Sequence, residues 1–313
     1  MSKKALVTGC AGFIGSHLCE NLLDRGYQVI GIDCFTDYYD RNLKVKNLYA
    51  CIGNDDFFFI ENDLREVKLY DYLKDIDFIF HQAGQPGVRG SWGNEFDVYT
   101  KNNILATQYL LEHVKNHPIK KMVYASSSSI YGNIKELPMR EGDLPKPFSP
   151  YGVSKLAAEN LCNLYHENYG VPVISLRYFT VYGPRQRPEM AISLFIQKIL
   201  KGETISIYGD GNQGRDFTYI DDIVCANILV AKSSLEGETF NVGSGHPIKV
   251  IDLIGILENI IGKKANIKFI EKQKGDVRDT YADISEIQNR LDFKPTFSIE
   301  EGLRNQVEYM KNT

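Results

Sequence analysis

The sequence has no surplus of basic residues: 36 Lys and Arg stand against 40 Asp and Glu, which gives a net charge of −4. The two signs are mixed along the chain, so we expect no nucleic-acid partner. No apolar run approaches the roughly 18 residues that a membrane-spanning helix needs. The longest candidate, residues 192–200, is interrupted by Gln197 and Lys198. We therefore expect no membrane partner either.

Cysteines are few, and their spacing contains no paired motif. None of the six belongs to a CxxC motif, and nothing before the first expected strand resembles a signal peptide. These features predict a reduced, cytoplasmic protein. The six residues are Cys10, Cys19, Cys34, Cys51, Cys162 and Cys225.

Patterns of metal ligands are equally scarce. His113 and His117 have the i, i+4 spacing of ligands on a helix, but no HExxH motif accompanies them and Pro118 ends that helix at once. Asp221 and Asp222 are explained by a helix start, because acidic groups there cap the chain and interact favourably with the helix dipole. We therefore predict no metal site.

The chain is long enough for about two domains and a sizeable core. Its 43% hydrophobic content, with 19 Tyr and 16 Phe, excludes a disordered chain. Short β-branched or aromatic runs alternate with helix-like segments, which predicts βαβ units and a parallel sheet. These runs are residues 5–8, 29–32, 57–60, 78–80, 122–125 and 173–176.

The alternating pattern ends after Tyr182, where Gly183 and Pro184 interrupt it. An α/β fold with a doubly wound parallel sheet is therefore expected in residues 1–181 plus 216–242. A smaller α/β substrate-binding domain is expected in residues 182–215 plus 243–313.

A glycine-rich turn joins the first expected strand to a helix expected at residues 16–24. Gly9, Gly12 and Gly15 have a GxxGxxG spacing, which lets the backbone approach a pyrophosphate at the positive N-terminal end of the helix. The second strand ends in Asp33, the acidic position expected to bind a ribose 2′-hydroxyl. A carboxylate there repels a 2′-phosphate, and no Arg follows it directly. The combination predicts a Rossmann-type fold that binds NAD rather than NADP.

Asp63 and Leu64 follow the third expected strand. In a dinucleotide-binding fold they would lie near the adenine. Asp63 has a second interpretation as the cap of the helix that follows, because a carboxylate accepts hydrogen bonds from the first free backbone N–H groups of a helix. The sequence leaves both interpretations open.

A YxxxK motif stands at the start of a later helix. Tyr151 and Lys155 are four residues apart, so they share one face of that helix. A phenol has a pKa of about 10 and becomes a base near neutral pH only when a nearby cation stabilises the phenolate. The fifth strand ends in four serines, residues 126–129, whose hydroxyls should lie over the cofactor crevice.

Together these motifs resemble the extended short-chain dehydrogenase/reductase family, specifically its NAD-dependent nucleotide-sugar epimerases, over essentially the whole chain. The resemblance implies that Tyr151 is the general base and acid, that Lys155 lowers its pKa and holds the nicotinamide ribose, and that Ser127 binds the reacting sugar hydroxyl. It also implies a homodimer. The cofactor contacts it implies are Gly9, Gly12, Phe13, Ile14, Gly15, Asp33, Asp63, Leu64, Ala83, Gly84, Tyr151, Lys155, Tyr178 and Val181.

The serine run separates related chemistries. Sugar-nucleotide 4,6-dehydratases resemble this family but carry Asp-Glu at the positions of Ser128 and Ser129, and UDP-glucuronate decarboxylases carry Glu at the second of them. Without a carboxylic acid to protonate a leaving hydroxyl, oxidation at C4 followed by return of the same hydride is the chemistry left. The expected reaction is epimerisation.

Residues 177–191 resemble the TVYGPxxRPxMA stretch of UDP-glucuronate 4-epimerases. Thr180 stands where galactose epimerases typically have Asn. The Arg187 guanidinium can bind a carboxylate bidentately, and it would restrain a 4-keto uronate, a β-keto acid, from aligning its carboxylate for loss of CO₂. A surface arginine beside two prolines is the alternative interpretation.

Residues 209–217 and 275–278 resemble the nucleotide-diphosphate segments of the family, and they contribute Arg215 and Arg278. Thr280 stands where some galactose epimerases have a bulky Tyr, so the sugar pocket is expected to be roomy. The predicted substrate-binding residues are Arg89, Ser127, Ser128, Thr180, Arg187, Arg215 and Arg278.

The sequence thus predicts NAD-dependent C4 epimerisation of a UDP-sugar through a transient 4-keto intermediate, with UDP-glucuronate favoured. UDP-N-acetylglucosamine and UDP-glucose are the alternative substrates. A reductase or dehydrogenase that releases its nicotinamide in each cycle is a different class, and a non-catalytic NAD sensor is another. The intact set of Ser127, Tyr151 and Lys155 argues against the sensor.

Overall fold

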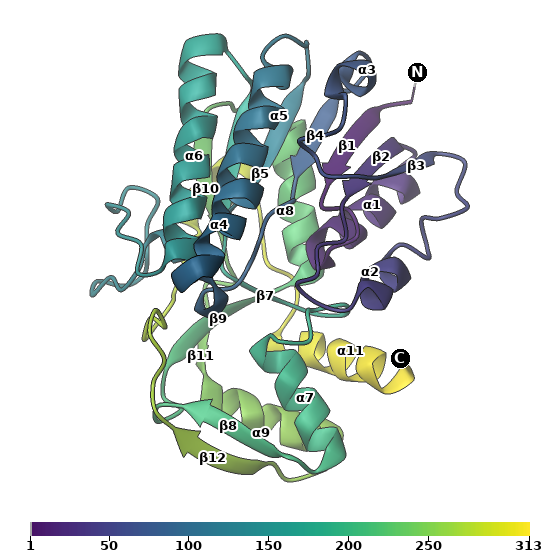
Figure 1. The fold of residues 1–313 in the computed structure, drawn as a ribbon. Helices are drawn as coiled ribbons and strands as arrows, with labels where there is room; N and C mark the ends of the chain where they lie inside the picture. Colours follow the sequence, from purple (N-terminus) through teal and green to yellow (C-terminus); the bar gives the residue numbers. More distant parts are fainter. Residues whose placement is uncertain (1) are drawn as a thin grey trace.

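The computed structural model describes residues 2–313, and a seven-stranded parallel sheet forms its centre (Figure 1). From one edge to the other the strands are β10 (Glu238–Val242), β6 (Val173–Tyr178), β5 (Lys121–Ser127), β4 (Phe78–His81), β1 (Lys4–Thr8), β2 (Gln28–Asp33) and β3 (Phe57–Glu61). The predicted α/β fold class with a doubly wound parallel sheet is confirmed.

The sheet is buried on both faces, since successive side chains of a strand point to opposite sides. In β1, Ala5 and Val7 join one hydrophobic cluster and Leu6 joins the other. The first cluster packs under α1 (Phe13–Asp24) and α8 (Ile220–Lys232), and the second under α3 (Leu69–Leu73), α5 (Ala106–Val114) and α6 (Pro150–Tyr169).

A second group of elements lies below the large sheet in Figure 1. It contains a three-stranded sheet of β11 (Pro247–Lys249), β9 (Gly214–Tyr219) and β7 (Thr180–Tyr182), and a parallel pair of β8 (Thr204–Tyr208) and β12 (Asn266–Ile270). Its long helices are α7 (Ala191–Lys201), α9 (Val250–Ile261) and α11 (Ile299–Asn312). The expected domain boundary at residue 216 falls inside β9.

Three short helices complete the fold: α2 (Arg41–Asn47), α4 (Phe96–Tyr99) and α10 (Ser285–Leu291). Helix α10 packs against β10 at one edge of the large sheet. Within residues 2–313, no helix has both the length and the apolar character needed to cross a bilayer.

Helix α1 begins at Phe13 rather than at the predicted residue 16. Gly12 is extended, with φ −75° and ψ 175°, and serves as the N-cap, so the helix starts directly after the glycine turn. No acidic side chain occupies its first turn, and no side chain caps it. Its first N–H groups are therefore available to an anion.

Ser149 and Pro150 define the start of helix α6. The Ser149 hydroxyl accepts a hydrogen bond from the Gly152 N–H at 3.1 Å, and Pro150 occupies the first helical position. Gly170 ends the helix in the left-handed conformation, with φ +69°. The start of the helix is thus fixed, which fixes the direction of Tyr151 one residue later.

A buried ion pair lies between α6 and the large sheet. The Arg177 Nη2 of β6 is 2.7 Å from the Glu159 Oε1 of α6, and their side chains are only 7% and 2% exposed. The Ser126 hydroxyl donates to the same carboxylate, and the Arg177 guanidinium also donates to the Tyr131 hydroxyl. Strands β5 and β6 therefore hold α6 through one shared network.

Replacing Glu159 by Ala should lower the free energy of unfolding by about 3 to 5 kcal/mol, because it leaves the buried Arg177 charge without a partner. Chemical denaturation measures this change. Glu61→Ala is the control: it breaks the exposed Arg41–Glu61 pair, whose side chains are 54% and 50% exposed, and should cost less than about 1 kcal/mol. Equal losses in the two variants would contradict a specific role for the buried pair.

Candidate active site

A cavity of about 480 Å³ opens at the carboxyl ends of the parallel strands. Its lining comes from the segments that follow β1, β2, β3, β4 and β5, together with the start of α6 and β7. Ligands of open α/β sheets bind in the crevice where the strand order reverses, and this reversal lies between β1 and β4.

The structure brings all the predicted cofactor residues into the lining of this cavity, together with four of the predicted substrate residues. The cofactor set is Gly9, Gly12, Phe13, Ile14, Gly15, Asp33, Asp63, Leu64, Ala83, Gly84, Tyr151, Lys155, Tyr178 and Val181. The substrate residues in the lining are Ser127, Ser128, Thr180 and Arg187.

The glycine turn requires residues without side chains. Gly9 has φ +69°, and a Cβ atom there would lie 2.8 Å from the backbone of Ala83. A Cβ atom on Gly15 would collide with the carbonyl oxygen of Gly9. The close packing of these backbones places the N-terminus of α1 beside the end of β4.

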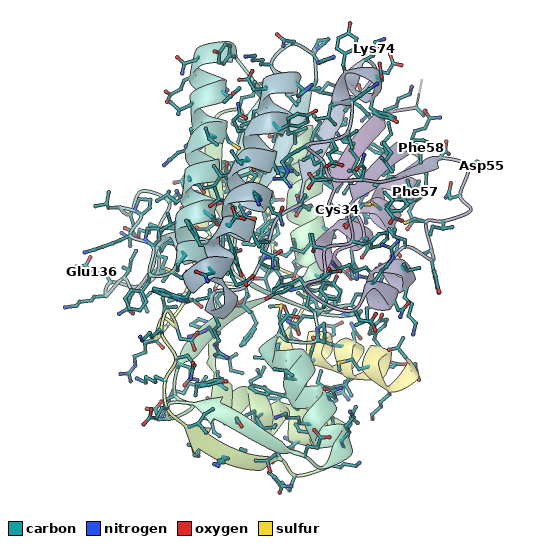
Figure 2. The ribbon with its side chains drawn as sticks, viewed as in Figure 1. Cys34, Asp55, Phe57, Phe58, Lys74 and Glu136 are labelled. Atoms are coloured by element: carbon teal, nitrogen blue, oxygen red, sulfur yellow. The ribbon has the colours of Figure 1, made fainter. Side chains whose placement is uncertain are left out.

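Asp33 ends β2 and closes the same turn. One carboxylate oxygen accepts a hydrogen bond from the Ala11 N–H at 3.0 Å, and the other accepts one from the Phe35 N–H at 2.9 Å. Burial raises the pKa of Asp33, and these two hydrogen bonds oppose the rise. The next residue, Cys34, is labelled in Figure 2 at this end of the strand and also lines the cavity.

Lys44 of α2 was not predicted, yet it lines the cavity beside Asp33. Its side chain is buried and donates to the hydroxyl and the carbonyl oxygen of Thr36. Burial lowers the pKa of Lys44, and the Asp33 charge opposes this effect. No sequence pattern marked it, because its place in the site depends on how α2 folds back towards β2.

Asp63 lines the cavity but does not cap a helix, so the capping interpretation is wrong. Helix α3 begins only at Leu69, with Lys68 as its N-cap. The Asp63 carboxylate instead accepts hydrogen bonds at 2.9 Å from the backbone N–H and the Nε of Arg65, and the side-chain bond is the main cause of its lowered pKa.

Ser127, Tyr151 and Lys155 meet in the cavity from β5 and α6. Burial raises the pKa of Tyr151, whereas the Ser127 hydroxyl and the Arg187 charge lower it. Burial lowers the pKa of Lys155 to about 8, and its Nζ lies 4.7 Å from the centre of the Tyr124 ring. The arrangement can hold and move a proton at the phenolic oxygen.

Asn103 fixes the position of α6 relative to β4 and was also not predicted. It lies in a π-helical turn, residues 100–105, a feature often found at functional sites. Its side-chain oxygen accepts a hydrogen bond from the Gln85 N–H at 2.6 Å, and its Nδ2 donates to the Ser154 hydroxyl at 2.8 Å. Ser154 lies between the two residues of the YxxxK motif.

Three predicted substrate arginines lie outside the cavity lining, grouped near Asp276. The Arg89 Nη2 is 2.8 Å from the Asp276 carboxylate, and its guanidinium lies 4.0 Å from the Tyr208 ring centre. Arg215 donates to three backbone carbonyls, those of Gly214, Val277 and Arg278. The side chain of Arg278 is 67% exposed and lies 3.7 Å from Asp279.

The cavity thus combines a dinucleotide-type glycine turn with a buried Ser, Tyr and Lys set, which together define a Rossmann-type enzyme site. The chain matches the NAD dependent epimerase/dehydratase family over residues 5–243, and it belongs to that family.

Several relatives share nearly the full length of the chain. A UDP-glucuronate 4-epimerase from Thermodesulfobacterium geofontis is 42% identical over 311 residues, with 98% of this chain and 95% of the relative covered. The UDP-glucuronic acid 4-epimerase from Bacillus cereus, in complex with UDP-glucuronic acid and NAD, has a TM-score of 0.96 and 44% identity, with 99% of both chains covered. The UDP-N-acetylglucosamine 4-epimerase from Methanobrevibacter ruminantium M1, in complex with UDP-N-acetylmuramic acid, has a TM-score of 0.93 and 35% identity, again over 99% of both chains. The predicted family resemblance is confirmed.

Gly15→Ala should remove bound NAD, because the added methyl group collides with the Gly9 carbonyl and displaces the turn. Extraction and chromatography of the purified protein should find mainly NAD in the wild type, and about a tenth of that amount or less in the variant. Gly255→Ala is the matched control: apart from the backbone of its own helix and its chain neighbours, no atom lies within 4 Å of the added Cβ, so NAD should be retained. NADP as the majority species in the wild type would contradict the role given to Asp33.

Proposed function

We propose that this protein is an NAD-dependent UDP-sugar 4-epimerase with UDP-glucuronate as its favoured substrate. The observation that carries the proposal is that Ser127, Tyr151, Lys155 and Arg187 line one cavity together with a glycine turn of the dinucleotide type. The UDP-glucuronate 4-epimerases among the relatives support the choice of substrate.

The residues of the cavity fit NAD. The free N–H groups of α1 follow a glycine turn that no Cβ atom could enter, which suits a pyrophosphate. Asp33 presents a carboxylate to the adenosine ribose at the end of β2, and Lys155 holds the nicotinamide ribose. When bound there, NAD would supply a reversible hydride acceptor for C4 of the sugar.

Tyr151 moves the proton. As the phenolate it removes the proton of the sugar C4 hydroxyl, and as the phenol it returns that proton when the C4 ketone is reduced. Burial raises the pKa of the Tyr151 phenol, Ser127 and Arg187 oppose this rise, and the Lys155 ammonium adds a positive charge on the same helix face. Ser127 orients the hydroxyl that reacts.

Two serines in the cavity lining exclude an elimination step. Ser128 and Ser129 occupy the positions where a dehydratase needs carboxylic acids, and a neutral hydroxyl does not protonate a leaving group effectively. The 4-keto sugar is therefore reduced again, and addition of the hydride to the opposite face of C4 gives the epimer.

Arg187 recognises the C6 carboxylate of the sugar. Its guanidinium lines the cavity, and its charge acts on Tyr151 and Tyr38, which also line it. Arg89, Arg215 and Arg278 supply positive charge for the UDP diphosphate. A UDP-N-acetylhexosamine is the second candidate substrate, favoured by the relative from Methanobrevibacter ruminantium M1.

The proposed enzyme has an NAD-binding domain of residues 1–181 plus 216–242 and a nucleotide-sugar-binding domain of residues 182–215 plus 243–313. It is a homodimer that works in the cytoplasm. Exposed apolar side chains on and beside α6 support the dimer, and the free thiols of all six cysteines support a reducing compartment. The apolar side chains are Leu105, Val153, Leu164 and Tyr169, between 47% and 57% exposed.

Tyr151→Phe should lower kcat by about 10²- to 10⁴-fold, because only the group that carries the proton is lost. Turnover assays measure this change, with bound NAD and the melting temperature expected to match the wild type. Tyr169→Phe, at the exposed end of the same helix, is the control and should keep full activity. A rate within tenfold of the wild type in Tyr151→Phe would remove this residue from the role.

Arg187→Ala should lower kcat/KM for UDP-glucuronate by about tenfold to 150-fold, the effect of a lost charge-assisted contact. Parallel assays with UDP-glucose and UDP-N-acetylglucosamine should show much smaller losses. Some decarboxylated pentose product is expected from UDP-glucuronate, since nothing restrains the carboxylate of the β-keto acid. Equal losses with all three sugars would assign Arg187 to the nucleotide or to the fold, and would favour UDP-N-acetylglucosamine as substrate.

A further inference from the structure

Arg187 already has a carboxylate partner within the chain. Its Nε lies 3.1 Å from the Oε1 of Glu189, two residues further on. The Arg187 side chain is 18% exposed and that of Glu189 is 39% exposed, so the carboxylate lies on the solvent side of the pair. The Arg187 guanidinium also faces the cavity, whose lining includes Arg187.

The backbone just before this pair is held firmly. Arg185 has φ +64°, and its Nη2 donates to both carboxylate oxygens of Glu20 on α1, at 2.7 and 2.8 Å. The buried Gln186 side chain is bonded to Ser193 of α7 and Gln306 of α11. The backbone that leads into Arg187 is therefore fixed, so a ligand that enters acts on the side chains of Arg187 and Glu189.

Tyr38 is a second polar group close to Glu189. The ring of Tyr38 lies 5.7 Å from the Arg187 guanidinium, and the charges of Arg187 and Glu189 both act on the pKa of the Tyr38 hydroxyl, the first lowering it and the second raising it. Tyr38 also lines the cavity. Glu189 can thus exchange an ion pair for a hydrogen bond without leaving the surface of the site.

The proposed reaction places a requirement on this arginine. Inversion at C4 with one bound hydride carrier requires the keto sugar to present both of its faces in turn, and the C6 carboxylate moves with the ring. If the guanidinium bound this carboxylate with no competing partner, it would stabilise one orientation of the keto sugar and oppose its rotation in the site. A competing carboxylate nearby reduces the affinity of Arg187 for the substrate carboxylate.

We propose that Glu189 is a competing counter-ion that exchanges with the substrate carboxylate at Arg187. This exchange sets the affinity for uronates and the rate at which the keto sugar rotates in the site. The proposal rests on the proposed function in one respect, namely that a carboxylate-bearing sugar is the substrate. It adds a specificity-determining residue that does not touch the reacting atoms.

Glu189→Gln tests the exchange, because it removes the charge and keeps the shape. Calorimetric titration of the NAD-bound protein should show that the preference for UDP-glucuronate over UDP-glucose, as a ratio of Kd values, rises about threefold to tenfold. The kcat for UDP-glucuronate should fall by a similar factor, since the substrate is held more tightly than the transition state for turning. Glu189→Asp, which keeps the charge, should restore most of the wild-type ratio.

Glu300→Gln is the matched control, because it removes an exposed glutamate from an Arg304 pair on α11, away from the cavity. It should leave the Kd ratio and kcat within about twofold of the wild type. Weaker binding of UDP-glucuronate by Glu189→Gln would show that Glu189 positions Arg187 rather than competes with the substrate, and would overturn the proposal. An unchanged ratio would overturn it as well. Failure of the wild type to epimerise UDP-glucuronate would refute the proposed function alone, because the binding ratio still reports on Glu189.

Discussion

The site depends on one close approach of backbone to backbone at the end of β1. Gly9 packs against Ala83 at the end of β4, and Gly15 packs against the carbonyl of Gly9, at distances that no side chain would permit. This packing places the N-terminus of α1 at the crevice where the strand order reverses. The predicted cofactor residues, from Asp33 to Lys155, line the same crevice.

The second constraint is electrostatic. Burial alone makes Tyr151 a weaker acid and Lys155 a weaker base. The site therefore needs further charges and hydroxyls that lower the pKa of Tyr151 towards neutral pH. Arg187 contributes to this from the substrate side, while the Glu159 carboxylate raises the pKa of Lys155 from within the same helix. The charge proposed to bind the sugar carboxylate therefore also lowers the pKa of the phenol.

Local motifs let the sequence predict the glycine turn, Asp33 and the YxxxK helix, because each depends on spacing within one strand–turn–helix unit. Residues whose roles arise from long-range contacts escaped prediction: Lys44 reaches the cavity through the fold of α2, and Asn103 joins two segments through a π-helical turn. The helix expected after Asp63 begins too late for that residue to cap it. Placement of the three arginines near Asp276 likewise follows from how distant loops meet.

The most direct test of the account is incubation of the purified protein with separate UDP-sugars, without added cofactor, followed by NMR of the products. The account predicts that UDP-glucuronate is converted to its C4 epimer at the highest kcat/KM, with the bound NAD regenerated in every cycle. Turnover only in the presence of stoichiometric added nicotinamide cofactor would contradict it and indicate a reductase or dehydrogenase. Epimerisation confined to UDP-N-acetylglucosamine would contradict the assignment of the carboxylate to Arg187.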